Sequence, residues 1–141
     1  MKMLRAPELY ETDPNWLSAY ASSDLILLVD DDPEHLLLFS TVLENAGYEV
    51  LTASNARDGL RLLKTEPISC VISDIMMPET SGVDFVKEAR SSSKLRLIPI
   101  ILLTSGREDL EFASLALGAD MFCLKKDARR LLPAQVDFLL G

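Results

Sequence analysis

Charged and hydroxyl side chains follow four of the apolar segments of this 141-residue chain, at the point where each segment ends. They are Asp30, Asp31 and Asp32 after the first segment, Asp74 after the third, Thr104 and Ser105 after the fourth, and Lys125 and Lys126 after the fifth. Carboxylates a few ångströms apart repel one another unless a cation lies between them. Their oxygens suit Mg²⁺, a hard cation that keeps several waters and bridges readily to phosphate.

A carboxylate in such a site can attack phosphorus and form an acyl phosphate. A lysine ammonium would offset the charge on the transferred group, and a threonine hydroxyl would hydrogen-bond one of its oxygens. If the segment ends converge in the fold, the pattern therefore predicts magnesium-dependent phosphoryl chemistry.

Each of these residues also has a simpler interpretation. Asp32 followed by Pro33 is typical of a helix N-cap with proline at the first helical position. Asp30 and Asp31 could be solvated loop acids, and a single lysine at a strand end is usually a surface residue. We favour the shared site because all of these simpler interpretations would have to hold together.

The apolar segments alternate with amphipathic ones from Leu25 onward. Strands are expected at Leu25–Val29, Tyr48–Ala53, Ile68–Ser73, Ile98–Leu103 and Met121–Leu124. Helices are expected from Pro33 to Ala46, from Asn55 to Pro67, at Val83–Arg90, at Glu108–Leu117, and between Ala128 and Leu140, where Pro133 either begins or kinks the helix. This alternation implies a parallel sheet with helices on both faces, whose functional groups gather at the carboxyl ends of the strands.

Residues 1–24 differ from the rest in composition, because they contain Pro7, Pro14, several acids and the only tryptophan, Trp16. We favour a loosely held extension there and a single domain over residues 25–141. The alternative is a short helix at residues 15–20, begun by Asp13 and Pro14.

The composition narrows the classes of partner. The chain has a formal net charge of −8 and is 48% hydrophobic, so we expect a globular domain that binds neither nucleic acid nor membranes directly. Cys70 and Cys123 lie inside apolar runs without metal-ligand spacing, which favours buried reduced thiols in a cytoplasmic protein. No apolar run reaches transmembrane length, and Glu8, Glu11 and Asp13 interrupt any signal-peptide core.

Four segments, in order, resemble the receiver domains of bacterial response regulators. They are Leu27–Pro33 (LLVDDDP), Asp74–Pro78 (DIMMP) followed by Ser81-Gly82, Pro99–Ser105 (PIILLTS), and Gly118–Asp120 (GAD) leading to Lys125. The resemblance runs from Leu25 to about Leu140. It implies a doubly wound, flavodoxin-like α/β fold, (βα)5, with a five-stranded parallel sheet in the order 2-1-3-4-5.

The resemblance also implies a role for each matching position. Asp74 is the residue that is phosphorylated. Magnesium is bound by the Asp31 and Asp74 side chains and the Met76 backbone carbonyl, with Asp30 assisting through water. Thr104 contacts the phosphoryl group and Lys125 pairs with it. Thr104 and Phe122 are switch positions, although ordinary half-buried packing explains Phe122 equally well.

The same resemblance implies the partners. The phosphoryl group would come from a sensor histidine kinase, a phosphotransfer protein or a small phosphodonor. The domain would catalyse its own phosphorylation and dephosphorylation, and so change a surface that binds a downstream effector protein or an output domain outside this chain. A homodimer is left open.

The sequence departs from the family pattern at one position, Lys126. At two variable positions, Met76 and Gly106, its residues bear on the lifetime of the phosphorylated form. Lys126 follows the active-site lysine where the family usually has proline in a cis peptide, so we expect a trans bond and a different loop. Met76 and Gly106 occupy variable positions that tune loss of the phosphoryl group in this family. Neither side chain can orient an attacking water, so we expect a slowly decaying phosphorylated form.

Two alternatives stand beside the receiver interpretation. A phosphatase of the haloacid-dehalogenase type would use Asp30 as its nucleophile, but Glu34 stands where that family has Thr or Val, and no cap domain fits. A degenerate receiver would have lost phosphorylation and would act only as an interaction module. The presence of all five site side chains argues against this alternative; they are Asp30, Asp31, Asp74, Thr104 and Lys125. His35, the only histidine, is interpreted as an exposed helix residue.

Overall fold

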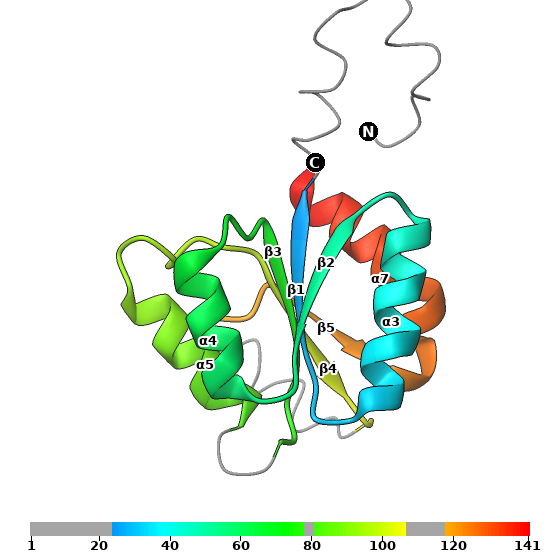
Figure 1. Ribbon diagram of the computed structural model, residues 1–141, viewed down its shortest axis with the longest axis horizontal. Coiled ribbons are helices and arrows are strands. Elements are labelled where there is room, and N and C mark those ends of the chain that lie inside the picture. The colour runs from blue at the N-terminus through cyan, green and yellow to red at the C-terminus, as the bar shows by residue number, and fades with distance from the viewer. Residues whose placement is uncertain (1–23, 78–80, 107–117) are drawn as a thin grey trace, which may run out of the picture.

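The computed structural model describes residues 24–77, 81–106 and 118–141 (Figure 1). Two predictions fall outside these ranges: the short helix at residues 15–20 and the helix at residues 108–117. Among the described residues, no helix is long and apolar enough to cross a membrane.

Five strands and four helices are described, with the labels of Figure 1. In chain order they are β1 (Leu25–Val29), α3 (Pro33–Asn45), β2 (Glu49–Ala53), α4 (Ala56–Thr65), β3 (Cys70–Asp74), α5 (Gly82–Ser91), β4 (Ile100–Thr104), β5 (Met121–Leu124) and α7 (Lys125–Leu140). All strand pairs are parallel, and the order across the sheet is β2-β1-β3-β4-β5. The predicted fold class and strand order are therefore confirmed.

The sheet separates two hydrophobic cores. Helices α3 and α7 cover one face, and α4 and α5 cover the other (Figure 1). Strands β3 and β4 are buried along their whole length, as expected for central strands that face helices on both sides. Cys70 and Cys123 are free and lie in the core under α3 and α7, where burial raises their thiol pKa to about 12 and about 11. Both are therefore thiols with little reactivity in the folded state.

Three helices begin where a side chain caps them. The side chains of Asp32, Asn55 and Ser81 accept hydrogen bonds from backbone N–H groups in the first turns of α3, α4 and α5. Such caps satisfy donors that have no partner within the helix. The predicted starts of these helices are correct to within a residue.

The last helix differs from the prediction. Helix α7 begins at Lys125, directly after β5, and continues through Pro133. No side chain caps its start, and the Lys125–Lys126 peptide is trans, as expected without proline. Lys125 therefore projects from the first turn of a helix, so its backbone is more tightly held than a loop residue would be.

The Gly118–Asp120 motif has a structural role in this fold. The Asp120 carboxylate accepts a hydrogen bond from the Ile100 backbone N–H (2.8 Å) and pairs with the Arg90 guanidinium (3.0 Å). Arg90 also donates to the carbonyls of Gly118 (2.9 Å) and Ile98 (2.7 Å). One side chain of α5 thus fastens the segments that enter β4 and β5.

Candidate functional site

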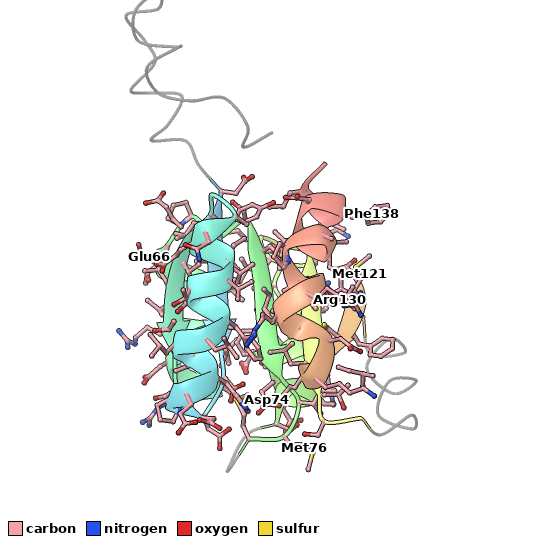
Figure 2. All side chains as sticks on the ribbon, turned by 90° about the vertical axis from the view of Figure 1, so that its right-hand side faces the viewer. Glu66, Asp74, Met76, Met121, Arg130 and Phe138 are labelled. Carbon is pink, nitrogen blue, oxygen red and sulfur yellow. The ribbon has the colours of Figure 1, made fainter. Side chains whose placement is uncertain are left out.

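The predicted site residues meet at the carboxyl end of the sheet. Val29 pairs with Ser73, Asp74 with Leu103 and Thr104 with Leu124, so the ends of β1, β3, β4 and β5 are level. Figure 2 shows Asp74 and Met76 at this end, far from Glu66 and Phe138 at the other. Because the strand order is as predicted, the residues after these strands become neighbours.

Three carboxylates form the centre of the site. Asp30, Asp31 and Asp74 each offer an oxygen within 4.8 Å of the others. Asp30 and Asp74 are buried, whereas Asp31 is exposed. The backbone N–H of Asp32 donates to Asp30 Oδ1 (2.9 Å), and that of Met76 donates to Asp74 Oδ1 (3.2 Å), so the local turns orient both buried side chains.

Lys125 provides the one cationic side chain that contacts this cluster among the described residues. Its Nζ lies 3.1 Å from Asp30 Oδ2 and 3.1 Å from Asp74 Oδ2. Burial alone would lower the pKa of Lys125, but the Asp74 and Asp30 carboxylates outweigh it and raise that pKa above its ordinary value. The ammonium therefore stays charged at neutral pH.

One ammonium does not balance the cluster. Burial raises the pKa of Asp74, and repulsion from Asp30 raises it further, while Lys125 lowers it without cancelling the rise. The ionised form of Asp74 is thus electrostatically unfavourable in the folded domain. A further positive charge among the carboxylates would relieve this.

The residues present fit a magnesium ion. Their donor atoms are carboxylate oxygens, which a hard divalent cation prefers. Asp30 Oδ2 is buried, and within the part of the chain described its close partner is the Lys125 ammonium, an ion pair without hydrogen-bond geometry. A bound cation, directly or through one of its waters, would give this buried oxygen a further partner.

Thr104, Phe122 and Met76, the other predicted site residues, differ in burial. Thr104 is the buried last residue of β4, and its Oγ1 accepts a hydrogen bond from the Gly106 backbone N–H (3.3 Å). Phe122 is half-buried on β5, which agrees with both interpretations of that side chain. The Met76 side chain is exposed at the mouth of the site.

The interpretation of His35 as a plain exposed residue was wrong. Its Nδ1 lies 3.1 Å from Lys125 Nζ, 3.5 Å from Asp30 Oδ2 and 3.4 Å from Asp32 Oδ2. Only a third of the side chain is exposed, and its ring stacks on Phe39 (centroids 5.6 Å apart, planes at 22°). The signal was helical spacing, because residue 35 shares a helix face with the capping Asp32 and the core residue Phe39.

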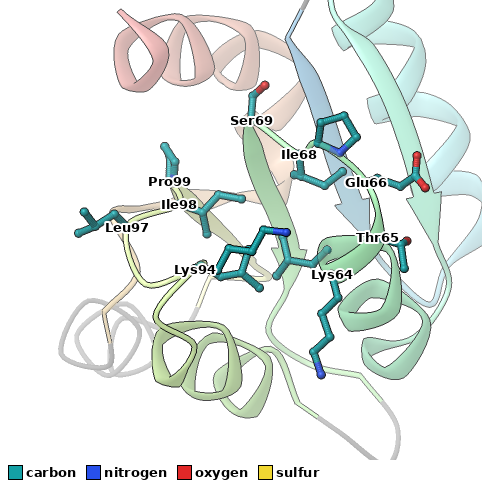
Figure 3. A pocket seen from close by; sticks show the side chains of 12 residues that line it. Lys64, Thr65, Glu66, Ile68, Ser69, Lys94, Leu97, Ile98 and Pro99 are labelled. Atoms are coloured by element: carbon teal, nitrogen blue, oxygen red, sulfur yellow. The ribbon is translucent and has the colours of Figure 1, made fainter.

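A surface pocket lies at the opposite end of the sheet. It is formed by the end of α4 and the segments that lead into β3 and β4, with Lys64, Lys94 and Leu97 among its lining residues (Figure 3). None of the predicted site residues lines it. The candidate site is therefore the acidic cluster and not this pocket.

The fold and the site together define the class of protein. It is a doubly wound α/β domain with buried carboxylates and a lysine at the carboxyl end of its sheet. Residues 26–137 match the response regulator receiver domain. The chain belongs to this family and is a receiver domain of two-component response regulators.

Curated relatives carry the same domain within longer proteins. The transcriptional regulatory protein GltR of Pseudomonas aeruginosa is 36% identical over 121 residues, which are 85% of this chain and 50% of GltR. The CpxR homolog of Haemophilus influenzae is 42% identical over 102 residues, 72% of this chain and 43% of that protein. The chain thus spans about half the length of the curated relatives it matches.

Solved structures share the fold. Chemotaxis protein CheY4 of Vibrio cholerae matches with a TM-score of 0.79 at 30% identity, over 84% of this chain and all of CheY4 (100%). TrrA of Thermotoga maritima, solved in complex with Mg²⁺–BeF, matches with a TM-score of 0.74 at 34% identity, over 83% of this chain and 99% of TrrA.

Proposed function

We propose that Asp74 accepts a phosphoryl group in a magnesium-dependent reaction. The observation that carries the proposal is the grouping of Asp30, Asp31 and Asp74 oxygens within 4.8 Å, with Lys125 Nζ at 3.1 Å from Asp74 Oδ2. Magnesium would be held by the Asp31 and Asp74 side chains and the Met76 carbonyl, with Asp30 assisting through water. When bound, the ion would neutralise charge on the carboxylates and on the incoming phosphoryl group.

The chain's own residues supply the rest of the reaction. An Asp74 carboxylate oxygen attacks phosphorus, a bond forms between them, and the bond from phosphorus to the donor's imidazole nitrogen or acyl oxygen breaks. Lys125 offsets negative charge on the transferred group, and the Thr104 hydroxyl hydrogen-bonds one of its oxygens. Because most of the catalysis is positioning and charge stabilisation, the domain would catalyse its own phosphorylation.

The donor and the output follow from the same proposal. A sensor histidine kinase or a phosphotransfer protein donates the phosphoryl group in the cytoplasm, in keeping with two free and buried cysteines. Phosphorylation then shifts a two-state equilibrium involving Thr104 and Phe122. The changed surface binds an effector protein, an output domain or a second copy of the chain.

The phosphorylated form decays slowly under this proposal. The exposed Met76 side chain is a thioether and Gly106 has no side chain, so neither position offers a side-chain acid, base or amide that could orient an attacking water at the acyl phosphate. We expect decay over hours in magnesium, measured as loss of the phosphoryl mass after the donor is removed. Decay within minutes would contradict this expectation.

The test of the function is the intact mass of the protein after incubation with acetyl phosphate and MgCl₂. A single phosphoryl adduct is expected on the wild type, and none on Asp74→Asn or in EDTA. Glu88→Gln, an exposed carboxylate of α5 changed in the same way, is the matched control and is expected to behave as the wild type. Absence of an adduct on the folded wild type would favour the degenerate interaction module.

A further inference from the structure

The Lys125 ammonium has one partner that the proposed reaction does not use. An ammonium carries three N–H donors. Three atoms lie at the same distance of 3.1 Å from Nζ: Asp74 Oδ2, which accepts a hydrogen bond, Asp30 Oδ2, which forms an ion pair, and His35 Nδ1. The two carboxylates belong to the strand ends, whereas His35 approaches from α3.

The contact between His35 Nδ1 and the Lys125 ammonium depends on the form of the imidazole. A cationic ring 3.1 Å from the ammonium would place two like charges in contact, which is strongly unfavourable at a half-buried site. The contact is favourable when Nδ1 is the acceptor and the proton is on Nε2. The contact therefore requires the neutral Nε2–H tautomer, because a proton on Nδ1 would instead point to Asp32 Oδ2 (3.4 Å) or Asp30 Oδ2 (3.5 Å).

His35 is also held firmly enough to act as an anchor. Its ring stacks on Phe39, which is 2% exposed and belongs to the core between the sheet and helices α3 and α7. Both residues lie on α3, whose start is fixed by the Asp32 cap. The position of Nδ1 is thus set by packing, independently of Lys125.

We propose that His35 is a positioning residue that holds the Lys125 ammonium over Asp74 for phosphoryl transfer, and this rests on the function proposed above. Lysine has a long flexible stem and behaves as a mobile point charge, so an ammonium without fixed partners loses time in unproductive rotamers. Asp74 cannot be the fixed partner because its carboxylate is the group that reacts. His35 keeps one N–H of the ammonium occupied before and after the transfer, and leaves the others for Asp30 and the phosphoryl oxygens.

The contact also joins the two helices that cover one face of the sheet. His35 lies in the first turn of α3 and Lys125 in the first turn of α7, and their side chains meet at the carboxyl end of the sheet. Figure 1 shows these two helices on the same face of the sheet. The lysine is therefore placed by a helix on each side, and not by its own stem alone.

The decisive experiment is a double-mutant cycle on the rate of phosphorylation by acetyl phosphate. We expect His35→Leu to slow the reaction about tenfold, and His35→Asn, whose amide oxygen can take the place of Nδ1, to stay within about threefold of the wild type. In a Lys125→Met background the same His35→Leu change is expected to have no effect, because the group that it positions is gone. An undiminished effect of His35→Leu in that background, or a wild-type rate for His35→Leu alone, would overturn the proposal.

A second readout does not depend on phosphorylation. His35 is the only histidine, so a ¹H–¹⁵N spectrum of the imidazole ring needs no assignment. We expect the Nε2–H tautomer, with an Nδ1 resonance that shifts in Lys125→Met. A proton on Nδ1 would refute the contact. A wild type that takes no phosphoryl group would instead refute the function, while the spectrum would still decide whether His35 holds Lys125.

Discussion

At the scale of single residues, the site is a set of charges that do not cancel. Asp30 and Asp74 are both buried, and Lys125 is the one cationic side chain within 4 Å of them in the described ranges. The raised pKa of Asp74 expresses this excess of negative charge. Such an imbalance costs stability and is typical of functional sites, which agrees with the proposed binding of a divalent cation.

Removing the charge of Asp74 is therefore predicted to stabilise the fold. Because the folded-state pKa lies above the unfolded value, ionisation of Asp74 costs stability at neutral pH, and this cost is relieved as pH falls through the folded-state pKa. In EDTA at pH 7, Asp74→Asn is expected to melt several degrees above the wild type, since 1 kcal/mol corresponds to about 4 °C for a domain of this size. The difference should shrink as pH falls toward the ordinary carboxyl pKa.

The control for this prediction is Glu88→Gln, which changes the net charge equally on the exposed face of α5. It is expected to leave the midpoint temperature within about 1 °C of the wild type. A lower midpoint for Asp74→Asn at pH 7 would mean that the ion pair with Lys125 outweighs burial and repulsion.

At this scale the sequence revealed the carboxylates and the lysine but not His35. Asp30, Asp74 and Lys125 could be predicted because each follows an apolar strand, and parallel strands end at a common edge. His35 reaches the site from the side of a helix. That approach depends on where α3 and α7 pack relative to each other, which strand ends alone do not specify.

At the scale of elements, the end of β3 and the start of α5 are in direct contact. The Gly82 N–H donates to the Ile75 carbonyl (2.9 Å), and a Cβ on Gly82 would lie 2.2 Å from the Asp74 carbonyl oxygen. Only glycine allows this approach. The first residue of α5 thus packs against the backbone of the proposed phosphoacceptor.

Gly82→Ala is predicted to lower the free energy of unfolding by about 1–3 kcal/mol, because the backbone atoms around the added methyl group must move apart. The phosphorylation rate should fall as well, since Asp74 moves with its carbonyl. Chemical denaturation and the acetyl phosphate reaction measure the two effects. Glu88→Ala, which replaces an exposed residue of the same helix, is the control. Equal stability of both variants would contradict the contact.

The elements themselves could be predicted well from the sequence, with one instructive error. Strands β1 and β5 have the predicted bounds because short apolar runs between polar residues leave little choice. The start of α7 was predicted too late because Leu124 is not a capping residue and Pro133 weakens the helical pattern. Packing against β4, β5 and α3 outweighs both local features.

At the scale of the whole molecule, the predicted site residues gather at one end of the sheet, and the two hydrophobic cores occupy the rest. The two cores hold the strand ends level. The three carboxylates lie at the strand ends and are not members of either core. If magnesium binds there as proposed, its binding is expected to raise the stability of the whole domain. The sequence could not predict the output of the protein, because the chain spans about half the length of the curated relatives that it matches.

Magnesium is predicted to raise the midpoint temperature of the wild type, by an amount that grows with the ratio of its free concentration to its dissociation constant. A free concentration one hundred times the dissociation constant stabilises the folded state by about 2.7 kcal/mol. Asp31→Asn should lose most of this shift, because Asp31 is an exposed member of the cluster and is not needed for packing. Glu49→Gln, an exposed acid at the opposite end of the sheet, should retain it. An equal shift in all three proteins would contradict a specific site.

The most direct test of the account is to identify the aspartate that carries the phosphoryl group. Treatment of the acetyl phosphate reaction with borohydride reduces an aspartyl phosphate to homoserine, and peptide mass spectrometry then locates it. The account predicts homoserine at position 74 alone, and only in samples that contained magnesium. Homoserine at position 30 would contradict it and would instead support the phosphatase mechanism with Asp30 as nucleophile.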